Sequence, residues 1–125
     1  MAFIFEKLDV WNKSRNLVID IYKMLELFPK HENYALCDQI RRAAVSIPSN
    51  IAEGSGRASK RETAHFVEIA YGSLMEVYCQ LLVAWDLNYI QDTHINYIKP
   101  KVEEIAKMLS GYRKWLIDQK SAMTT

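Results

Sequence analysis

Glu62 and His65 are the first residues in this sequence whose types and spacing could support chemistry. They form an ExxH pair, the arrangement that supplies metal ligands in di-iron helical bundles. Such a site needs a second ExxH pair and two more inward-facing glutamates, but neither His31 nor His94 has a glutamate three residues before it. Glu62 also completes a capping box with Ser59, which is a helix-start signal. We therefore expect a solvated first helical turn here, with no metal ligands and no cofactor.

The two cysteines, Cys37 and Cys79, lack CxxC spacing and have no histidine at a neighbouring helical turn. A buried thiol is inert, and we expect both to be reduced, buried thiols of a cytoplasmic protein. The GSGR turn at residues 54–57 lacks the GKS or GKT ending of a nucleotide-binding loop and follows a helix, so it offers only a non-specific phosphate contact. No catalytic residues are predicted. We expect a protein that is not an enzyme, with a metal-dependent enzyme as the less favoured alternative.

Cations gather around the same turn. Arg57, Lys60 and Arg61 are close together in the sequence, and Glu62 is the one nearby acid. Contacts between arginine or lysine and phosphate do not depend on base sequence and weaken with salt, so this cluster is a candidate nucleic-acid surface. An ordinary solvated surface is the competing interpretation.

Two further arginines, Arg41 and Arg42, precede this turn on the same helix. They could add to the basic surface, but ion pairs with Asp38 or Glu53 are the interpretation that we favour for them. The complete set of candidate nucleic-acid-binding residues is Arg41, Arg42, Arg57, Lys60 and Arg61.

Hydrophobic periodicity of the helical kind runs through most of the chain. Together with start and stop signals it predicts four helices, at about residues 7–27, 31–53, 60–87 and 93–119. Short connections make neighbouring helices antiparallel. We therefore expect an all-α fold, an antiparallel up-down-up-down four-helix bundle that forms a single domain over residues 1–125.

The second of these helices carries the clearest core signal. Its apolar positions follow the spacing of one helix face, at Ile40, Ala44, Ile47 and Ile51. Pro48 lies inside the helix, where a proline removes one backbone hydrogen bond and crowds the carbonyl four residues earlier. We therefore predict a kink at Pro48. Gly54 suits the position just past the end of the helix.

The third helix carries more apolar surface than one bundle needs. Residues 74–85, LMEVYCQLLVAW, hold only two polar side chains, Glu76 and Gln80. A bundle helix normally keeps one face wet, so a second subunit is the simplest cover for this segment. Coverage by the chain's own residues 3–5 is the alternative. The candidate interface residues are Leu74, Met75, Tyr78, Cys79, Leu82, Val83 and Trp85.

The composition sets limits on partners and location. The chain has 125 residues, 50% of them hydrophobic, and a net charge of +1, so no global field attracts nucleic acid or a membrane. Every stretch of about 20 residues contains charge, and we expect no membrane-spanning helix. The N-terminus lacks the features of a signal peptide, which favours a cytoplasmic location. No small-molecule substrate is indicated.

The segment DQIRRAAVSIPSNIAEGSGR, residues 38–57, resembles the signature of the bacterial 23S rRNA intervening-sequence proteins, a family of small four-helix-bundle proteins. Looser similarity extends from FEKLDVW at residues 5–11 to residues 108–115. The resemblance implies an antiparallel bundle that assembles into a ring, often a pentamer. A relative, the accessory variability protein of diversity-generating retroelements, is such a ring and partners a reverse transcriptase and nucleic acid. The family offers a fold and a connection to RNA, and its activity is unknown.

Two hypotheses follow from the sequence. In the first, the chain is a non-enzymatic, ring-forming homo-oligomer that presents a basic surface to RNA or to a nucleic-acid enzyme. In the second, it is a protein–protein interaction scaffold that binds no nucleic acid.

Overall fold

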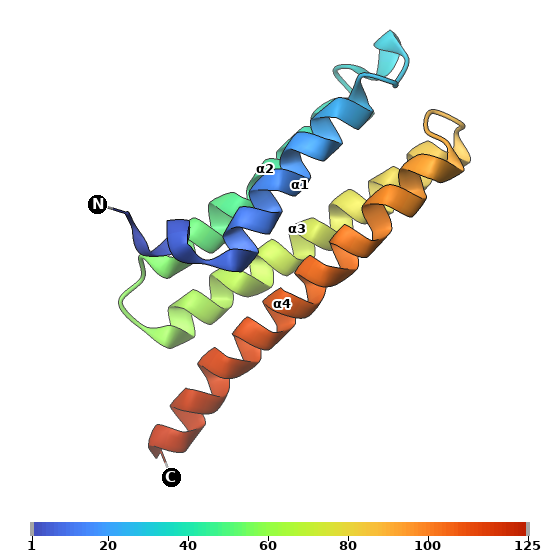
Figure 1. Cartoon of the computed structure of the whole chain (residues 1–125). Helices are drawn as coiled ribbons and strands as arrows, with labels where there is room; N and C mark the ends of the chain where they lie inside the picture. Colours follow the sequence, from blue (N-terminus) through green and yellow to red (C-terminus); the bar gives the residue numbers. More distant parts are fainter. Residues whose placement is uncertain (1, 125) are drawn as a thin grey trace.

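The computed structural model describes residues 2–124, with side chains over residues 2–118. Short 3-10 turns at Ile4–Lys7 (η1) and Lys30–Glu32 (η2) accompany four α-helices, α1 (Asp9–Leu25), α2 (Leu36–Ser55), α3 (Lys60–Asp86) and α4 (Asp92–Thr124). Successive helices run in opposite directions (Figure 1). The described residues contain no strand. The predicted antiparallel four-helix bundle is therefore confirmed.

The helices pack in chain order around the bundle. Each helix is adjacent to the next along the chain, and α1 is also adjacent to α4, whereas α1 and α3 lie diagonally opposite across the core. The apolar side chains of all four helices form one buried cluster. The predicted α2 stripe lies within it, because Ile40, Ala44 and Ile47 are 0% exposed and Ile51 is 1% exposed.

Two predicted boundaries of α2 are wrong. The helix begins at Leu36 instead of near residue 31, because residues after Pro29 form the separate 3-10 turn η2. The Glu32 carboxylate then accepts a hydrogen bond from the Leu36 N–H at 3.4 Å and so caps the later start. At the other end the helix continues through Gly54 to Ser55, so Gly54 is not the residue past its end.

Gly54 is needed for a different reason. A Cβ atom at this position would lie 2.7 Å from the Phe66 Cβ and 3.3 Å from the Thr63 carbonyl oxygen. The Thr63 hydroxyl in turn donates a hydrogen bond of 2.8 Å to the Gly54 carbonyl. The absent side chain therefore lets the end of α2 approach the start of α3. At Pro48, α2 is continuous, and a bend there stays a prediction.

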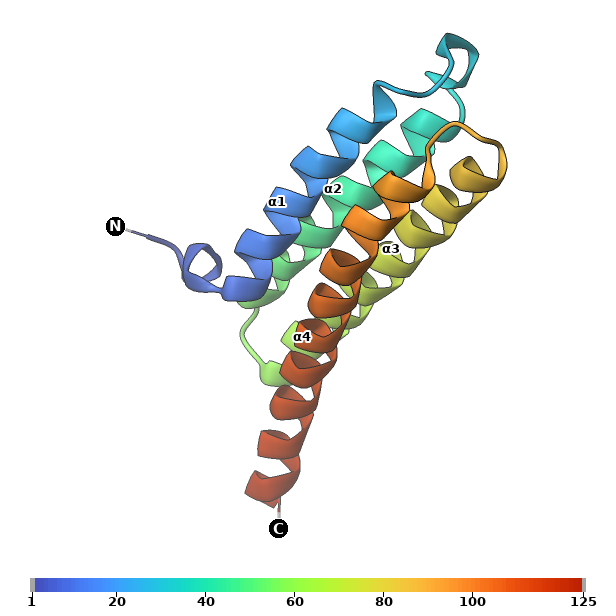
Figure 2. The same ribbon diagram turned by 45° about the vertical axis from the view of Figure 1, so that its right-hand side comes forward.

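The start of α3 and the end of α4 lie at the same end of the bundle (Figure 1). The predicted N-cap of α3 is confirmed, because the Ser59 hydroxyl accepts the Glu62 N–H at 3.1 Å. Helix α4 is longer than predicted, and its C-terminal turns project past the connection between α2 and α3 (Figures 1 and 2). The far end of the bundle carries the other two connections.

Helix α3 differs from the expectation that no helix of the chain could span a membrane. By length and composition it could cross a membrane, with a window of mean hydropathy 1.3, although the central helix of a bundle passes the same test. Ile69, Met75 and Val83 are 38%, 38% and 44% exposed, so part of the apolar surface of α3 faces outward.

Candidate nucleic-acid interface and assembly surface

One end of the bundle brings cations and aromatic rings together. The Lys60 Nζ lies 4.7 Å from the centre of the Trp115 ring, which the projecting part of α4 supplies. The Arg57 guanidinium lies 4.5 Å from the centre of the Phe66 ring, and the His65 ring meets Phe66 edge to face at 5.8 Å. We call this region the basic end, defined by Arg57, Lys60, Arg61, His65, Phe66 and Trp115.

The cations of the basic end differ in their partners. Arg57 donates to the Glu53 carboxylate at 2.8 Å, so part of its charge is neutralised. Among the described side chains, Lys60 and Arg61 have no carboxylate within 4.0 Å. These two cations are therefore available to an anion from solution.

Two open hollows flank Arg61 and His65, which are neighbours one turn apart on α3. One has a volume of about 560 Å³ and lies between the α2–α3 turn and the Phe66 ring. The other, of about 350 Å³, lies toward the end of α4 and is lined by Leu116 and Ile117. Glu62 lines the first hollow and Glu68 lines the second, so Arg61 faces one carboxylate in each.

The structure separates Arg41 and Arg42 from this cluster. Arg41 donates to the Asn33 carbonyl at 3.1 Å and to its side-chain oxygen at 2.7 Å. Arg42 pairs with Asp38 at 3.3 Å. At 1.5 Å per residue, these arginines lie about 20 Å or more along α2 from Arg57. The five predicted residues are therefore not one surface, and the ion pair predicted for Arg42 with Asp38 is present.

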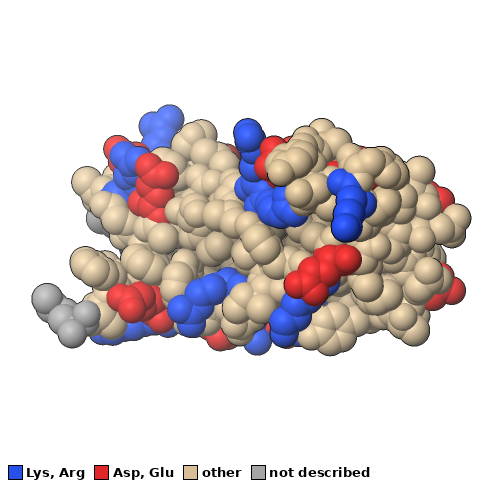
Figure 3. All heavy atoms as spheres, turned by 90° about the horizontal axis from the view of Figure 1, so that it is seen from above, with Lys and Arg blue, Asp and Glu red and all other residues tan. Residues whose placement is uncertain are grey.

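Charge elsewhere is mixed. Figure 3 shows basic and acidic side chains interspersed over the face seen from above, with uncharged surface between them. This distribution agrees with the net charge of +1. Any attraction for a polyanion must therefore be local.

The predicted interface residues on α3 do not all face outward. Leu74 is 0% exposed, so its assignment to a subunit interface is wrong: it belongs to the chain's own core. Tyr78 and Leu82 are half-buried and pack against that core. Trp85 is exposed near the end of α3, where its indole N–H donates to Asp92 at 2.8 Å.

The outward-facing residues form a continuous line instead. They share one side of the helix and are Ile69, Gly72, Met75, Glu76, Cys79, Val83 and Asp86. We call this set the α3 strip. Met75 and Val83 are 38% and 44% exposed, and Cys79 is exposed, which corrects the expectation that both thiols are buried. Cys37 is buried, and this burial raises the pKa of its thiol.

The chain's own N-terminus does not cover the α3 strip. The segment η1 contacts α1 and α2, and no contact with α3 is found among the described residues. Its Phe5 ring packs against Trp11 at 4.8 Å. The alternative that residues 3–5 hide the third helix is therefore wrong, and the strip is open to another molecule.

Within the described part of the chain, no group of three or more histidine, cysteine, aspartate or glutamate side chains is placed to hold a metal ion. Glu62 and His65 stand in the first turns of α3 without further ligands of this kind. The Glu62 backbone N–H is engaged by the Ser59 cap.

Sequence reasoning missed the rings of the basic end. Phe66 and Trp115 are 49 positions apart in the printed sequence, and the packing of α4 against α3 places the second beside Lys60. Comparison with known proteins adds one finding. A family model described as 23S rRNA-intervening sequence protein matches residues 6–111. No curated protein matches the chain.

Proposed function

The chain belongs to the 23S rRNA-intervening sequence protein family, and from this premise we propose that it is a non-enzymatic, homo-oligomeric protein of the cytoplasm that binds RNA at its basic end. The observation that carries the RNA part is the pair Lys60 and Arg61, two cations without a carboxylate partner among the described side chains. They stand beside aromatic rings at an exposed edge.

The chemistry of this edge suits RNA. Lysine and arginine neutralise phosphates, and exposed rings provide flat surfaces on which bases can stack. Trp115 is 51% exposed, so one part of its ring is free while Lys60 lies over another. The two hollows beside Arg61 have room for groups of the size of a nucleotide base.

A homo-oligomer would bind RNA more tightly than a single chain does, because it presents the basic end several times. A single chain with a net charge of +1 and one copy of the Lys60 and Arg61 pair should bind a polyanion weakly. Copies held together present the same edge several times, so binding of a second edge becomes intramolecular. Avidity of this kind can raise affinity by about 100-fold or more without any new contact. The α3 strip is the surface that favours assembly.

A gel-shift titration with a labelled, structured RNA hairpin tests the proposal. At about 50 mM salt we expect a complex that weakens strongly at about 200 mM salt. The K60A/R61A double variant should lose about tenfold in affinity, and its salt slope should fall by about two.

A matched control removes two cations elsewhere. Lys99 and Lys107 are exposed on α4, away from the basic end. The K99A/K107A variant should therefore bind RNA nearly as wild type does. Absence of binding at low salt, or equal losses in the two variants, would contradict RNA binding at the basic end.

A protein–protein scaffold is the second candidate. The observation that favours it is the amount of exposed apolar surface on α3, which a protein partner would bury. The same titration discriminates the two. An assembled protein that binds no RNA at low salt, yet retains a specific protein partner after nuclease treatment, would support the scaffold.

A further inference from the structure

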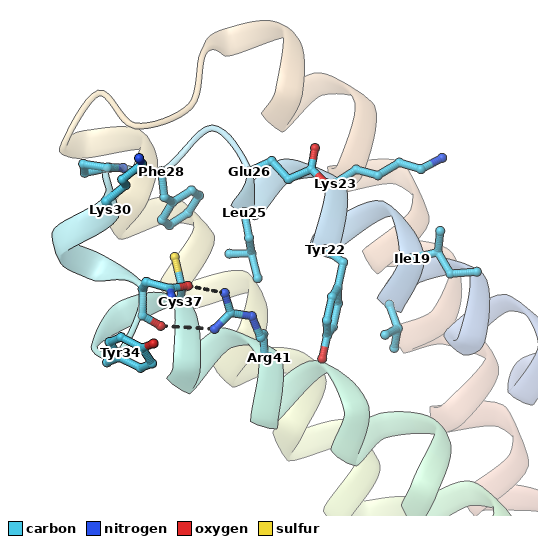
Figure 4. Close-up of a pocket in the computed structure, with 13 residues that line it drawn as sticks. Ile19, Tyr22, Lys23, Leu25, Glu26, Phe28, Lys30, Tyr34, Cys37 and Arg41 are labelled. Carbon is cyan, nitrogen blue, oxygen red and sulfur yellow. Dashed lines mark hydrogen bonds between the residues drawn. The ribbon is translucent and has the colours of Figure 1, made fainter.

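A cleft of about 950 Å³ opens between α1 and α2, at the end opposite the basic end. Figure 4 shows side chains from α1, from the start of α2 and from their connection around it. Its floor is apolar, with Leu25, Phe28 and Cys37 buried. Two apolar side chains of its lining, Ile19 and Tyr34, remain 50% and 91% exposed. We call this feature the α1–α2 cleft.

The charges of the cleft and of the α3 strip are opposite. Lys23, Lys30 and Arg41 line the cleft, and Glu26 is the one acid among its lining residues. From residue 70 to residue 86, by contrast, α3 contains Glu76 and Asp86 and no lysine or arginine. Both surfaces also carry exposed apolar side chains, so they are complementary in charge and alike in hydrophobicity.

Gly72 lies on the α3 strip, where the missing side chain leaves room for a close approach. Glycine inside a helix costs about 1 kcal/mol relative to alanine, and it usually has a reason. A Cβ atom at Gly72 would meet nothing within 4 Å, so no contact inside the chain requires a glycine there. Its place between Ile69 and Met75 on the α3 strip suits the close approach of another copy at this point.

Two α3 strips are poorly suited to each other. A symmetric contact would bring the Glu76 carboxylates of both copies into one apolar interface without a cation from either strip. Unpaired charges in such an interface are costly. The α1–α2 cleft supplies the missing cations.

We propose that the α3 strip of one copy docks into the α1–α2 cleft of the next copy. This inference rests on the homo-oligomeric part of the proposed function. Since α1 and α3 are diagonally opposite in the bundle, the strip and the cleft face different sides of the molecule. The contact is therefore head-to-tail, and repetition of a head-to-tail contact with suitable rotation closes a ring.

Charge reversal tests the pairing of these two surfaces. E76K and the double variant K23E/K30E should each raise the concentration at which the assembly half-dissociates by about tenfold or more. The triple variant E76K/K23E/K30E pairs a strip of no net charge, because Asp86 stays, with an acidic cleft that faces the cation introduced by E76K, and it should regain part of the assembly that each separate change loses. E103K reverses an exposed charge on α4 outside both surfaces and serves as the matched control.

The outcomes separate the inference from the proposed function. Helical content by circular dichroism first establishes that each variant folds. Unchanged assembly in K23E/K30E, or a folded triple variant that does not regain assembly, would overturn the pairing while homo-oligomerisation itself stands. A wild-type protein that is a single subunit would overturn both.

Cross-linking tests the same geometry without changing charge. Oxidation of I19C should join the new thiol in the cleft to Cys79 of the adjacent copy, and head-to-tail joining produces a ladder of dimers, trimers and larger species. The I19C/C79S variant should show no ladder, because the buried Cys37 is not accessible. Efficient Cys79–Cys79 dimers in wild type, with no ladder in I19C, would overturn the inference.

Discussion

The two halves of α3 share one core and differ in their outer surfaces. The first half, residues 60–69, presents Lys60 and Arg61 beside aromatic rings from its own chain. The second half, residues 70–86, has no cation and presents an apolar strip with two acids. The same helix therefore offers one surface suited to a polyanion and another suited to a protein with basic groups.

The core beneath does not change between the halves. Val67, Ala70, Leu74, Val77 and Leu81 follow one face of α3 and are at most 2% exposed. Fold and function thus depend on different faces of one helix. The difference implies that variants on the outer face can remove one proposed role and leave the fold intact, whereas core variants affect both halves.

The largest expected effect comes from the core that both halves share. Ile47, at the middle of α2, is 0% exposed. Ile47→Ala should lower the free energy of unfolding by about 2–5 kcal/mol, because it removes buried methyl groups and leaves a cavity. Chemical denaturation followed by circular dichroism measures this loss. A loss below about 1 kcal/mol would place Ile47 outside a packed core.

A smaller effect should be confined to the first half of α3. Gly54→Ala places a methyl group 2.7 Å from the Phe66 Cβ, so α2 and α3 must move apart near the basic end. We expect a loss of about 1–3 kcal/mol in the free energy of unfolding, together with weaker RNA binding.

Gly56→Ala is the control for this variant. A Cβ at Gly56 would lie 3.6 Å from the Glu53 carbonyl oxygen, which is an ordinary contact, and the backbone angle φ is −91°. Its stability should change little. Equal losses in the two variants would contradict the close approach at Gly54.

The smallest expected effect on stability comes from Gly72, in the second half of α3. Gly72→Ala should stabilise an isolated subunit by up to about 1 kcal/mol, because alanine favours the helix. The same change should weaken assembly, since the added methyl group faces the adjacent copy. Thermal unfolding and sedimentation velocity measure the two effects.

Gly111→Ala provides the matched comparison on α4. A Cβ there also meets nothing within 4 Å, and Gly111 lies outside both proposed assembly surfaces. It should gain similar stability and assemble normally. If Gly72→Ala assembles as well as Gly111→Ala does, the close approach at Gly72 is wrong.

The fold could be predicted from the sequence wherever apolar and polar residues alternate at helical spacing or a capping signal is present. The α2 stripe from Ile40 to Ile51 alternates with polar residues, and the helix start at Ser59 has a local chemical signal, so both could be predicted. The start of α2 could not, because proline permits either a helix or the 3-10 turn that forms.

The site was less predictable for two physical reasons. In residues 74–85 apolar side chains surround the helix, so the pattern does not reveal that Leu74 faces inward and Met75 outward. The contact of Lys60 with Trp115 joins distant segments and depends on how α4 packs against α3. Neither fact has a local signal.

The mass of the protein in dilute solution tests the central claim most directly. Val83 is 44% exposed on the α3 strip, and Val83→Glu adds an uncompensated carboxylate there. Ile4→Glu, at an exposed position on η1, is the control. By light scattering we predict that wild type and Ile4→Glu are multiples of the 14.5 kDa subunit and that Val83→Glu is a folded single subunit. A wild-type protein of 14.5 kDa, or a Val83→Glu variant with wild-type mass, would contradict the account.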